Sequence, residues 1–210
     1  GNNEVLAMST DLLTEGVHFD MVYSPLKHLG YKAVTVNLSD ILAMNCKPSQ
    51  ITFSIAVSSK FPVEAIDELY AGAEAACERY GIDLVGGDTT SCKAGLTIAV
   101  TAIGKGKKDE VVYRNGARLV FMETSGVQPD LAGFDYILER QLKPEPRADI
   151  IEELKRLEIQ PTSMIDISDG LASEVLHLAD QSNLGCQLYE DKLPITKEVD
   201  DASKAFQLDP

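Results

Sequence analysis

The stretch Met164-Ile-Asp-Ile-Ser-Asp-Gly-Leu171 places two carboxylates, Asp166 and Asp169, on either side of one hydroxyl, Ser168. The isoleucines in it are typical of the end of a buried strand, and the apolar residues after its glycine recur at helical spacing. The pattern predicts a strand that turns directly into a helix, with the acids at the turn. A helix cap made by Asp169 or Ser168 is the commoner use of such residues.

Three other acidic stretches follow apolar runs in the same way, and they are Ser9-Thr-Asp11, Asn37-Leu-Ser-Asp40 and Gly86-Gly-Asp-Thr-Thr90. One acidic turn is explained by capping, whereas four in a single chain indicate a metal site built from oxygen ligands. Asn37 and Asp40 lie in a predicted helix that is otherwise apolar. Because buried polar groups cost stability unless they have partners, these two residues are further candidates for a site.

The charge of the chain limits the possible partners. The 210 residues include 33 Asp and Glu against 19 Lys and Arg, which gives a net charge of −14. Binding to duplex nucleic acid needs a basic face, and electrostatic attachment to an anionic membrane needs basic clusters. The composition therefore argues against both partners, and it allows a polyanionic substrate only where cations bridge protein and substrate.

The four cysteines stand at wide spacings without a Cys-x-x-Cys motif, which is typical of reduced thiols in a cytoplasmic protein. No apolar run approaches the roughly 20 residues that a membrane span needs. The first residues also lack the pattern of a signal peptide. A cytoplasmic location without membrane association is the expectation.

The hydrophobic periodicity predicts an α+β protein with a mixed sheet covered by helices on one face. The expected strands are 4–9, 50–57, 82–85 and 96–103, and the expected helices are 25–47 and 62–81. The character of the chain changes after residue 113, where two further helices, 134–142 and 149–157, and a strand, 186–189, are expected. The predicted domains are therefore 1–113 and 114–210.

Four motifs, spread in order over nearly the whole chain, resemble those of the thiamine-monophosphate kinase family. This family belongs to an ATP-binding superfamily shared with aminoimidazole ribonucleotide synthetase, selenophosphate synthetase and a hydrogenase-maturation protein. The motifs are Ser9-Thr-Asp-Leu-Leu-Thr-Glu-Gly-Val-His-Phe19, Gly30-Tyr-Lys-Ala-Val-Thr-Val-Asn-Leu-Ser-Asp40, Leu84-Val-Gly-Gly-Asp-Thr-Thr90 and Ile165-Asp-Ile-Ser-Asp-Gly-Leu171.

The resemblance implies that ATP phosphorylates thiamine monophosphate to thiamine diphosphate with the help of several Mg²⁺ ions. It implies as magnesium ligands Thr10, Asp11, Asp40, Asp88, Asp166 and Asp169. It implies as nucleotide contacts Gly87, Asp88, Arg114, Ser168 and Tyr70. It places His18 against thiamine monophosphate, although a lone histidine among apolar neighbours is more often a packed core residue.

Phosphoryl transfer between two polyanions needs alignment and charge neutralisation more than it needs a protein base. The attacking phosphate oxygen is already ionised near neutral pH, so no general base is predicted. Arg114 is the candidate for a fixed positive charge, because a guanidinium stays protonated and grips phosphate in two places. The alternative is a surface arginine.

The resemblance also implies a homodimer in which the first domains' sheets join, and a C-terminal domain built as an α/β sandwich. The chain departs from the family at Leu119-Val120, where a glycine-rich turn and helix are expected, and this predicts a missing segment there. A Gly-Asp-Asp before the first strand and a Gly-Gly-Glu-Asp-Tyr-Glu after the last helix are absent from the printed sequence. The alternatives are another ATP-using superfamily member, such as a selenophosphate synthetase, and a non-catalytic nucleotide- or metal-binding protein.

Overall fold

A computed structural model describes residues 3–112, 135–168 and 170–206 of the protein. The chain forms two compact units, the first made of Gly1–Val111 with Leu142–Gln160 and the second made of Val112–Gln141 with Pro161–Pro210. The predicted second domain is 114–210, whereas residues 142–160 pack with the first unit.

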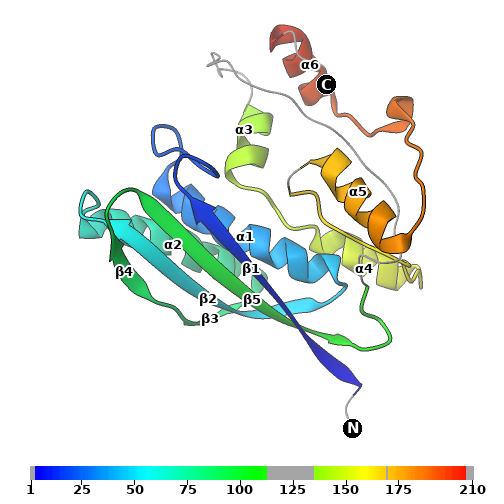
Figure 1. The fold of residues 1–210 in the computed structure, drawn as a ribbon, viewed down its shortest axis with the longest axis horizontal. Coiled ribbons are helices and arrows are strands. Elements are labelled where there is room, and N and C mark those ends of the chain that lie inside the picture. Colours follow the sequence, from blue (N-terminus) through cyan, green and yellow to red (C-terminus); the bar gives the residue numbers. More distant parts are fainter. Residues whose placement is uncertain (1–2, 113–134, 169, 207–210) are drawn as a thin grey trace. The chain divides into compact units, whose positions relative to one another are not determined.

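The first unit contains one mixed sheet (Figure 1). Its strands are β1 (Glu4–Thr14), β2 (Lys47–Ser58), β3 (Asp83–Gly86), β4 (Thr89–Cys92) and β5 (Leu96–Lys107). The order is β1-β5-β2-β3, and β4 also pairs with β2. Strand β5 runs antiparallel to both of its neighbours, while β3 and β4 run parallel to β2.

Helices α1 (Leu26–Ala43) and α2 (Val63–Tyr80) cover one face of this sheet (Figure 1). Alternation along the strands explains which face they cover, because successive side chains of a strand point to opposite sides. On β5 the side chains that face the helices are all buried, and these are Leu96, Ile98, Val100 and Ala102. The predicted α+β class, with helices on one face of a mixed sheet, is confirmed.

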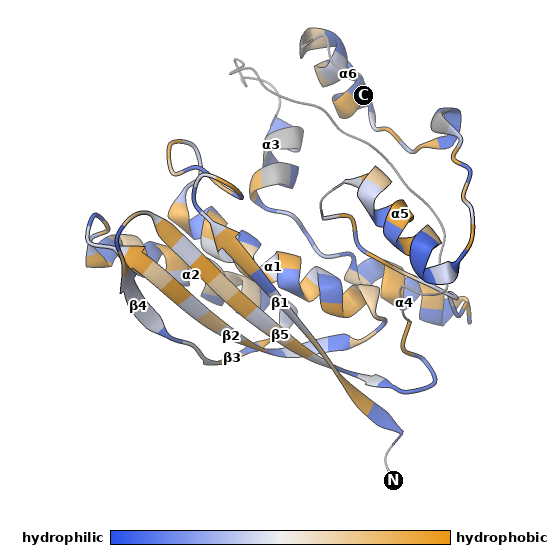
Figure 2. Cartoon of the chain, viewed as in Figure 1, coloured by the Kyte–Doolittle hydropathy of each residue, from blue (hydrophilic) through white to orange (hydrophobic). Residues whose placement is uncertain are grey.

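The opposite face of the sheet exposes apolar side chains along β1. Leu6, Met8 and Leu12 are 72%, 69% and 58% exposed. Figure 2 shows the hydrophobic stretches on β1, β5 and β2. A contiguous exposed apolar face of this kind is typical of a surface that another molecule covers.

The boundaries of α2 agree with the sequence prediction, whereas α1 ends earlier than predicted. Helix α2 starts directly after Pro62 and ends at Gly81, which takes the left-handed conformation with φ of 64°, as its sequence predicts. Helix α1 ends before the predicted residue 47, because Asn45 turns left-handed with φ of 56° and the next amide closes the last turn.

Two glycines let α1 and α2 pack with their backbones in contact. A Cβ atom added to Gly30 would lie 1.9 Å from the carbonyl oxygen of Leu69, and one added to Gly72 would lie 1.8 Å from that of Lys27. No side chain fits at these distances, so glycine sets the spacing of the two helices.

Glu145 fixes residues 142–147 to the two helices. Its carboxylate accepts hydrogen bonds from the hydroxyls of Tyr31 and Tyr80 and forms ion pairs with Arg79 and Lys143. Burial, together with the charge of Glu145, raises the pKa of Tyr31 to about 12. The tyrosine is therefore held as a neutral hydrogen-bond donor.

The two helices predicted after residue 113 are confirmed as α3 (Asp135–Leu142) and α4 (Ala148–Arg156). Helix α4 belongs to the first unit, whereas nearly all of α3 belongs to the second. The second unit further contains α5 (Leu171–Ser182), the 3₁₀ turn η2 (Glu190–Lys192) and α6 (Lys197–Phe206). The strands predicted at 165–167 and 186–189 are wrong, because neither segment joins a ladder and Ile167 is 61% exposed. Among the described residues of this unit there is no strand, and the α/β sandwich stays a prediction.

Candidate active site

A pocket of about 490 Å³ lies where the edge of the sheet meets α2 in the first unit. Three of its residues, Tyr70, Gly87 and Asp88, are ones that the resemblance assigns to nucleotide binding. The Tyr70 ring packs against Phe53, with ring centroids 5.3 Å apart and planes tilted by 54°. The remaining lining residues are Leu84, Val85, Gly86 and Thr89. The pocket thus combines an apolar wall with a turn that carries a carboxylate.

The Gly-Gly-Asp stretch interrupts an edge strand, whereas the sequence predicted a turn after the end of a strand. Both β3 and β4 pair with β2, and Gly87 and Asp88 lie between them. A Cβ atom on Gly87 would lie 1.9 Å from the Phe53 carbonyl oxygen, so only glycine allows this approach. The amide of Asp88 donates to Ser54 Oγ at 3.1 Å and its carbonyl accepts from the amide of Ile55 at 2.8 Å. The backbone is therefore fixed, and the Asp88 side chain stays exposed.

A second group of predicted residues meets between β1 and α1. Ser9 Oγ donates to the carboxylate of Asp40. The amide of Asp11 donates to Asn37 Oδ1 at 3.1 Å, and Asn37 Nδ2 donates to the carbonyl of Ala33 at 2.9 Å. Asn37 is fully buried, so its partners explain how an apolar helix tolerates it. Ser9 was not among the predicted site residues, although period-two alternation places it on the same face as Asp11.

Thr10 lies on the opposite face of the sheet from Asp11. Strand β1 continues to Thr14 instead of ending at residue 9, so the two neighbours alternate across it. Thr10 Oγ1 is hydrogen-bonded to Thr101 Oγ1 at 2.8 Å. Within residues 3–112, 135–168 and 170–206, no three His, Cys, Asp or Glu side chains form a group arranged to hold a metal ion.

His18 is exposed, so its interpretation as a packed core residue is wrong. It lies in a turn that follows β1, where its Nδ1 accepts a hydrogen bond from the amide of Thr14 at 3.0 Å. A neutral imidazole whose Nδ1 accepts carries its proton on Nε2. The histidine therefore offers an Nε2–H donor at the surface.

In the second unit, the predicted turn leads into α5 without a side-chain cap. The N-cap residue is Gly170, and Ser168 Oγ donates instead to Glu174 at 3.5 Å. Glu174 is only 4% exposed, and it is not among the predicted site residues. Asp166 is half-buried and has a polar partner.

Several predicted features lie outside the described residues. They are Asp169, Arg114 and the break expected between Leu119 and Val120.

Comparison with known proteins first shows the class of protein to which the N-terminal half of the chain is similar. The family model "AIR synthase related protein, N-terminal domain" matches residues 1–105. The chain is 33% identical to thiamine-monophosphate kinase of Bacillus subtilis over 95% of its own length and 66% of that relative. It is 31% identical to thiamine-monophosphate kinase of Methanospirillum hungatei over 93% of its own length and 68% of that relative. The chain therefore belongs to the thiamine-monophosphate kinase family.

A solved structure supports the same family. The structure described as AaThiL complexed with AMPPCP and TMP superposes with a TM-score of 0.83 at 27% identity, covering 99% of this chain and 70% of that one. The printed chain spans about two thirds of the length of the curated relatives that it matches.

Proposed function

We propose that the chain carries the nucleotide-binding part of a kinase that transfers the terminal phosphoryl group of ATP to thiamine monophosphate, giving thiamine diphosphate. The names of its relatives and the AMPPCP and TMP complex of a family member support this proposal. The observation that carries it is the meeting of Tyr70, Gly87 and Asp88 at one pocket, although they come from separate stretches of the sequence.

In this proposal the apolar wall of the pocket receives the nucleotide base, and the glycine turn lies beside its phosphates. Tyr70 supplies a ring face, while Gly87 has no side chain to block close approach to the backbone. Arg114 and Ser168 are assigned to ATP on the resemblance alone. Arg114 would stabilise the charge that develops during transfer.

The oxygen donors of the first unit fit Mg²⁺, which prefers carboxylates and hydroxyls and retains some of its waters. The Asp11 segment and the Ser9–Asp40 pair lie together between β1 and α1. The proposed ligands are Asp11, Asp40, Asp88, Asp166 and Asp169, with a hydroxyl from Ser9 or Thr10. When bound, such ions would screen the repulsion between the phosphates of the two substrates. Ser9 is the better hydroxyl ligand, because it contacts Asp40 on the face of β1 that carries Asp11, whereas Thr10 lies on the opposite face.

His18 is proposed to bind the phosphate of thiamine monophosphate. Its Nε2–H is available at the surface, since Nδ1 is occupied by the Thr14 amide. The histidine positions the acceptor and does not remove a proton from it, because the attacking phosphate oxygen is already ionised near neutral pH.

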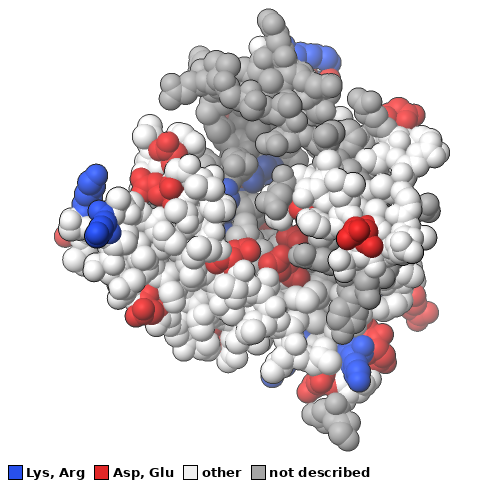
Figure 3. All heavy atoms as spheres, in the orientation of Figure 1, with Lys and Arg blue, Asp and Glu red and all other residues white. Residues whose placement is uncertain are grey.

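A second copy of the chain is the proposed partner of the exposed sheet face. Leu6, Met8 and Leu12 give that face an apolar character, and a self-complementary apolar patch is the usual basis of a two-fold dimer. Figure 3 shows acidic side chains spread over the described surface in view, which disfavours nucleic acid as a partner. No helix in the described part of the chain is long and apolar enough to cross a membrane. The four unpaired cysteines are compatible with the proposed cytoplasmic location.

The test is formation of ADP and thiamine diphosphate from ATP and thiamine monophosphate, with Mg²⁺ present or removed by EDTA. We expect metal-dependent turnover, and we expect Asp88→Asn to lower it by about 100-fold or more, the scale of losing one group that stabilises the transition state. The matched control is Asp180→Asn at an exposed position of α5. Turnover within a few-fold of the unchanged protein in Asp88→Asn would refute the role of Asp88.

The same assay separates the alternatives. Metal-dependent ATP binding without turnover of thiamine monophosphate would favour another ATP-using member of the superfamily or a non-catalytic nucleotide-binding protein. The absence of both binding and turnover would leave a shared fold without the proposed function.

A further inference from the structure

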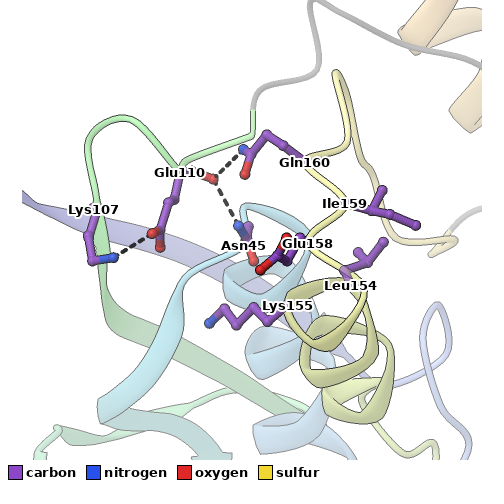
Figure 4. A pocket seen from close by; sticks show the side chains of 8 residues that line it. All are labelled: Asn45, Lys107, Glu110, Leu154, Lys155, Glu158, Ile159 and Gln160. Carbon is purple, nitrogen blue, oxygen red and sulfur yellow. Dashed lines mark hydrogen bonds and ion pairs between the residues drawn. The ribbon is translucent and has the colours of Figure 1, made fainter.

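A second pocket, of about 460 Å³, lies in the first unit beside the C-terminal end of α1. The ends of α1 and α4 and the turn after β5 enclose it (Figure 4). It shares no lining residue with the proposed nucleotide pocket. Its volume is in the range of small-molecule sites, about 300–1,000 Å³.

Two amide side chains line this pocket, and the nitrogen of each is held by the same backbone carbonyl. Asn45 Nδ2 and Gln160 Nε2 both donate to the backbone carbonyl of Glu110, at 2.9 and 3.0 Å. Each side chain therefore presents its oxygen as an acceptor. Asn45 is only 8% exposed, and Figure 4 shows its oxygen turned toward Glu158. An oxygen in this position can accept a hydrogen bond from a ligand in the pocket.

Glu158 adds a negative charge to these acceptors. It takes the left-handed conformation at the end of α4, with φ of 53°, which a non-glycine residue adopts only rarely. Asn45 takes the same conformation at the end of α1. Two helix C-termini thus meet at the pocket, and each carries a partial negative charge that favours a bound cation.

One cationic side chain of the pocket has no anionic partner in the described part of the chain. Lys107 is paired with the carboxylate of Glu110, whereas neither Lys155 nor Glu158 forms an ion pair among the residues that the structure describes. Lys155 and Glu158 are three residues apart and line the same pocket without pairing with each other. The pocket therefore offers an unpaired positive group and an unpaired negative group.

We propose that this pocket binds a small zwitterion of the amino-acid class. Its primary ammonium group would interact with Glu158, Asn45 Oδ1 and Gln160 Oε1, and its carboxylate would interact with Lys155. The side chains of Leu154 and Ile159, which also line the pocket, would contact the methylene groups between the two charges. This site is independent of the proposed kinase activity.

The experiment measures binding to the whole protein by titration calorimetry. The probes are glycine, β-alanine, γ-aminobutyrate and ε-aminocaproate, which differ in the spacing between the two charges. Butyrate and butylamine are the controls that carry one charge each. We expect saturable binding of at least one zwitterion at millimolar concentration, and binding weaker by about tenfold for both controls, the scale of one charge-assisted hydrogen bond.

Variants identify the site. Glu158→Gln and Lys155→Met change exposed side chains outside the proposed catalytic machinery, and each should weaken binding of the best zwitterion by about tenfold. Glu64→Gln and Lys60→Met, at exposed positions elsewhere, should leave it unchanged. The proposal is overturned if no zwitterion binds saturably, if a control with one charge binds equally well, or if the two pocket variants bind like the unchanged protein.

Discussion

The close contact between α1 and α2 makes Gly72→Ala the sharpest test of the fold. The added Cβ would lie 1.8 Å from the carbonyl oxygen of Lys27, whereas ordinary contact begins near 3.4 Å. The helices must therefore separate by about 1.6 Å, the difference between these distances. In an open helix the same substitution would stabilise the protein by about 1 kcal/mol. Forcing apart a packed core costs about 1–3 kcal/mol or more, and the clash here is with rigid backbone.

We expect the free energy of unfolding to fall by about 2 kcal/mol. This corresponds to a decrease of about 4–8 °C in Tm for a chain of this size. The measurement is thermal and urea unfolding of the variant and of the unchanged protein, followed by circular dichroism. Gly185→Ala is the matched control, since a Cβ there meets nothing within 4 Å, and its Tm should change little.

A double variant tests whether separation of α1 and α2 causes the loss of stability. A Cβ on Gly30 would lie 1.9 Å from the carbonyl oxygen of Leu69, across the same gap between the helices. Once one substitution has moved the helices apart, the second should cost less, so Gly30→Ala and Gly72→Ala together should destabilise by less than their sum. An unchanged Tm for Gly72→Ala would refute the close approach, and full additivity would refute the shared gap.

Three further predictions concern polar groups of the first unit. The pKa of Tyr31 is raised from 10.0 to about 12, mainly by burial. The contribution of Tyr31 to the free energy of unfolding should therefore be fully present below pH 10 and decrease by about 1.4 kcal/mol per pH unit between pH 10 and 12. Urea unfolding measured against pH should show a smaller decrease for Tyr31→Phe. Glu145→Gln replaces charge-assisted hydrogen bonds with neutral ones and should lower the free energy of unfolding, measured in urea, by about 1–2 kcal/mol. The control, Glu153→Gln in an exposed ion pair, should change it by less than about 1 kcal/mol. Equal effects of the two substitutions would contradict the stabilising role of the Glu145 contacts. Asn37→Leu removes the acceptor of the Asp11 amide and should cost about 1–3 kcal/mol, and a Tm equal to that of the unchanged protein would count against this bond.

The sequence determined those features that depend on neighbouring residues. The alternation of 96–103 predicts strand β5, and Pro62 and Gly81 mark the ends of α2. The acidic motifs and their order also predict the family, which the comparisons confirm. These signals are local, because the periods of strands and helices and the conformations of proline and glycine are properties of short segments.

The candidate site could be predicted only in part. Tyr70, Gly87 and Asp88 were predicted, and they line one pocket. Ser9 was missed because the strand was predicted to end at residue 9, whereas β1 continues to Thr14 and places Ser9 beside Asp40 on the face of Asp11. The metal and substrate roles of the other predicted residues stay predictions.

Only the tertiary structure decided which of the predicted residues share a face or a partner. Strand pairing extends β1 to Thr14 and so sends Thr10 and Asp11 to opposite sides of the sheet. The approach of Gly87 to the Phe53 carbonyl turns an apparent loop into a break in an edge strand. The residues that pair in these contacts are far apart in the sequence, and packing and hydrogen bonding between such segments select one register from several that local periodicity allows.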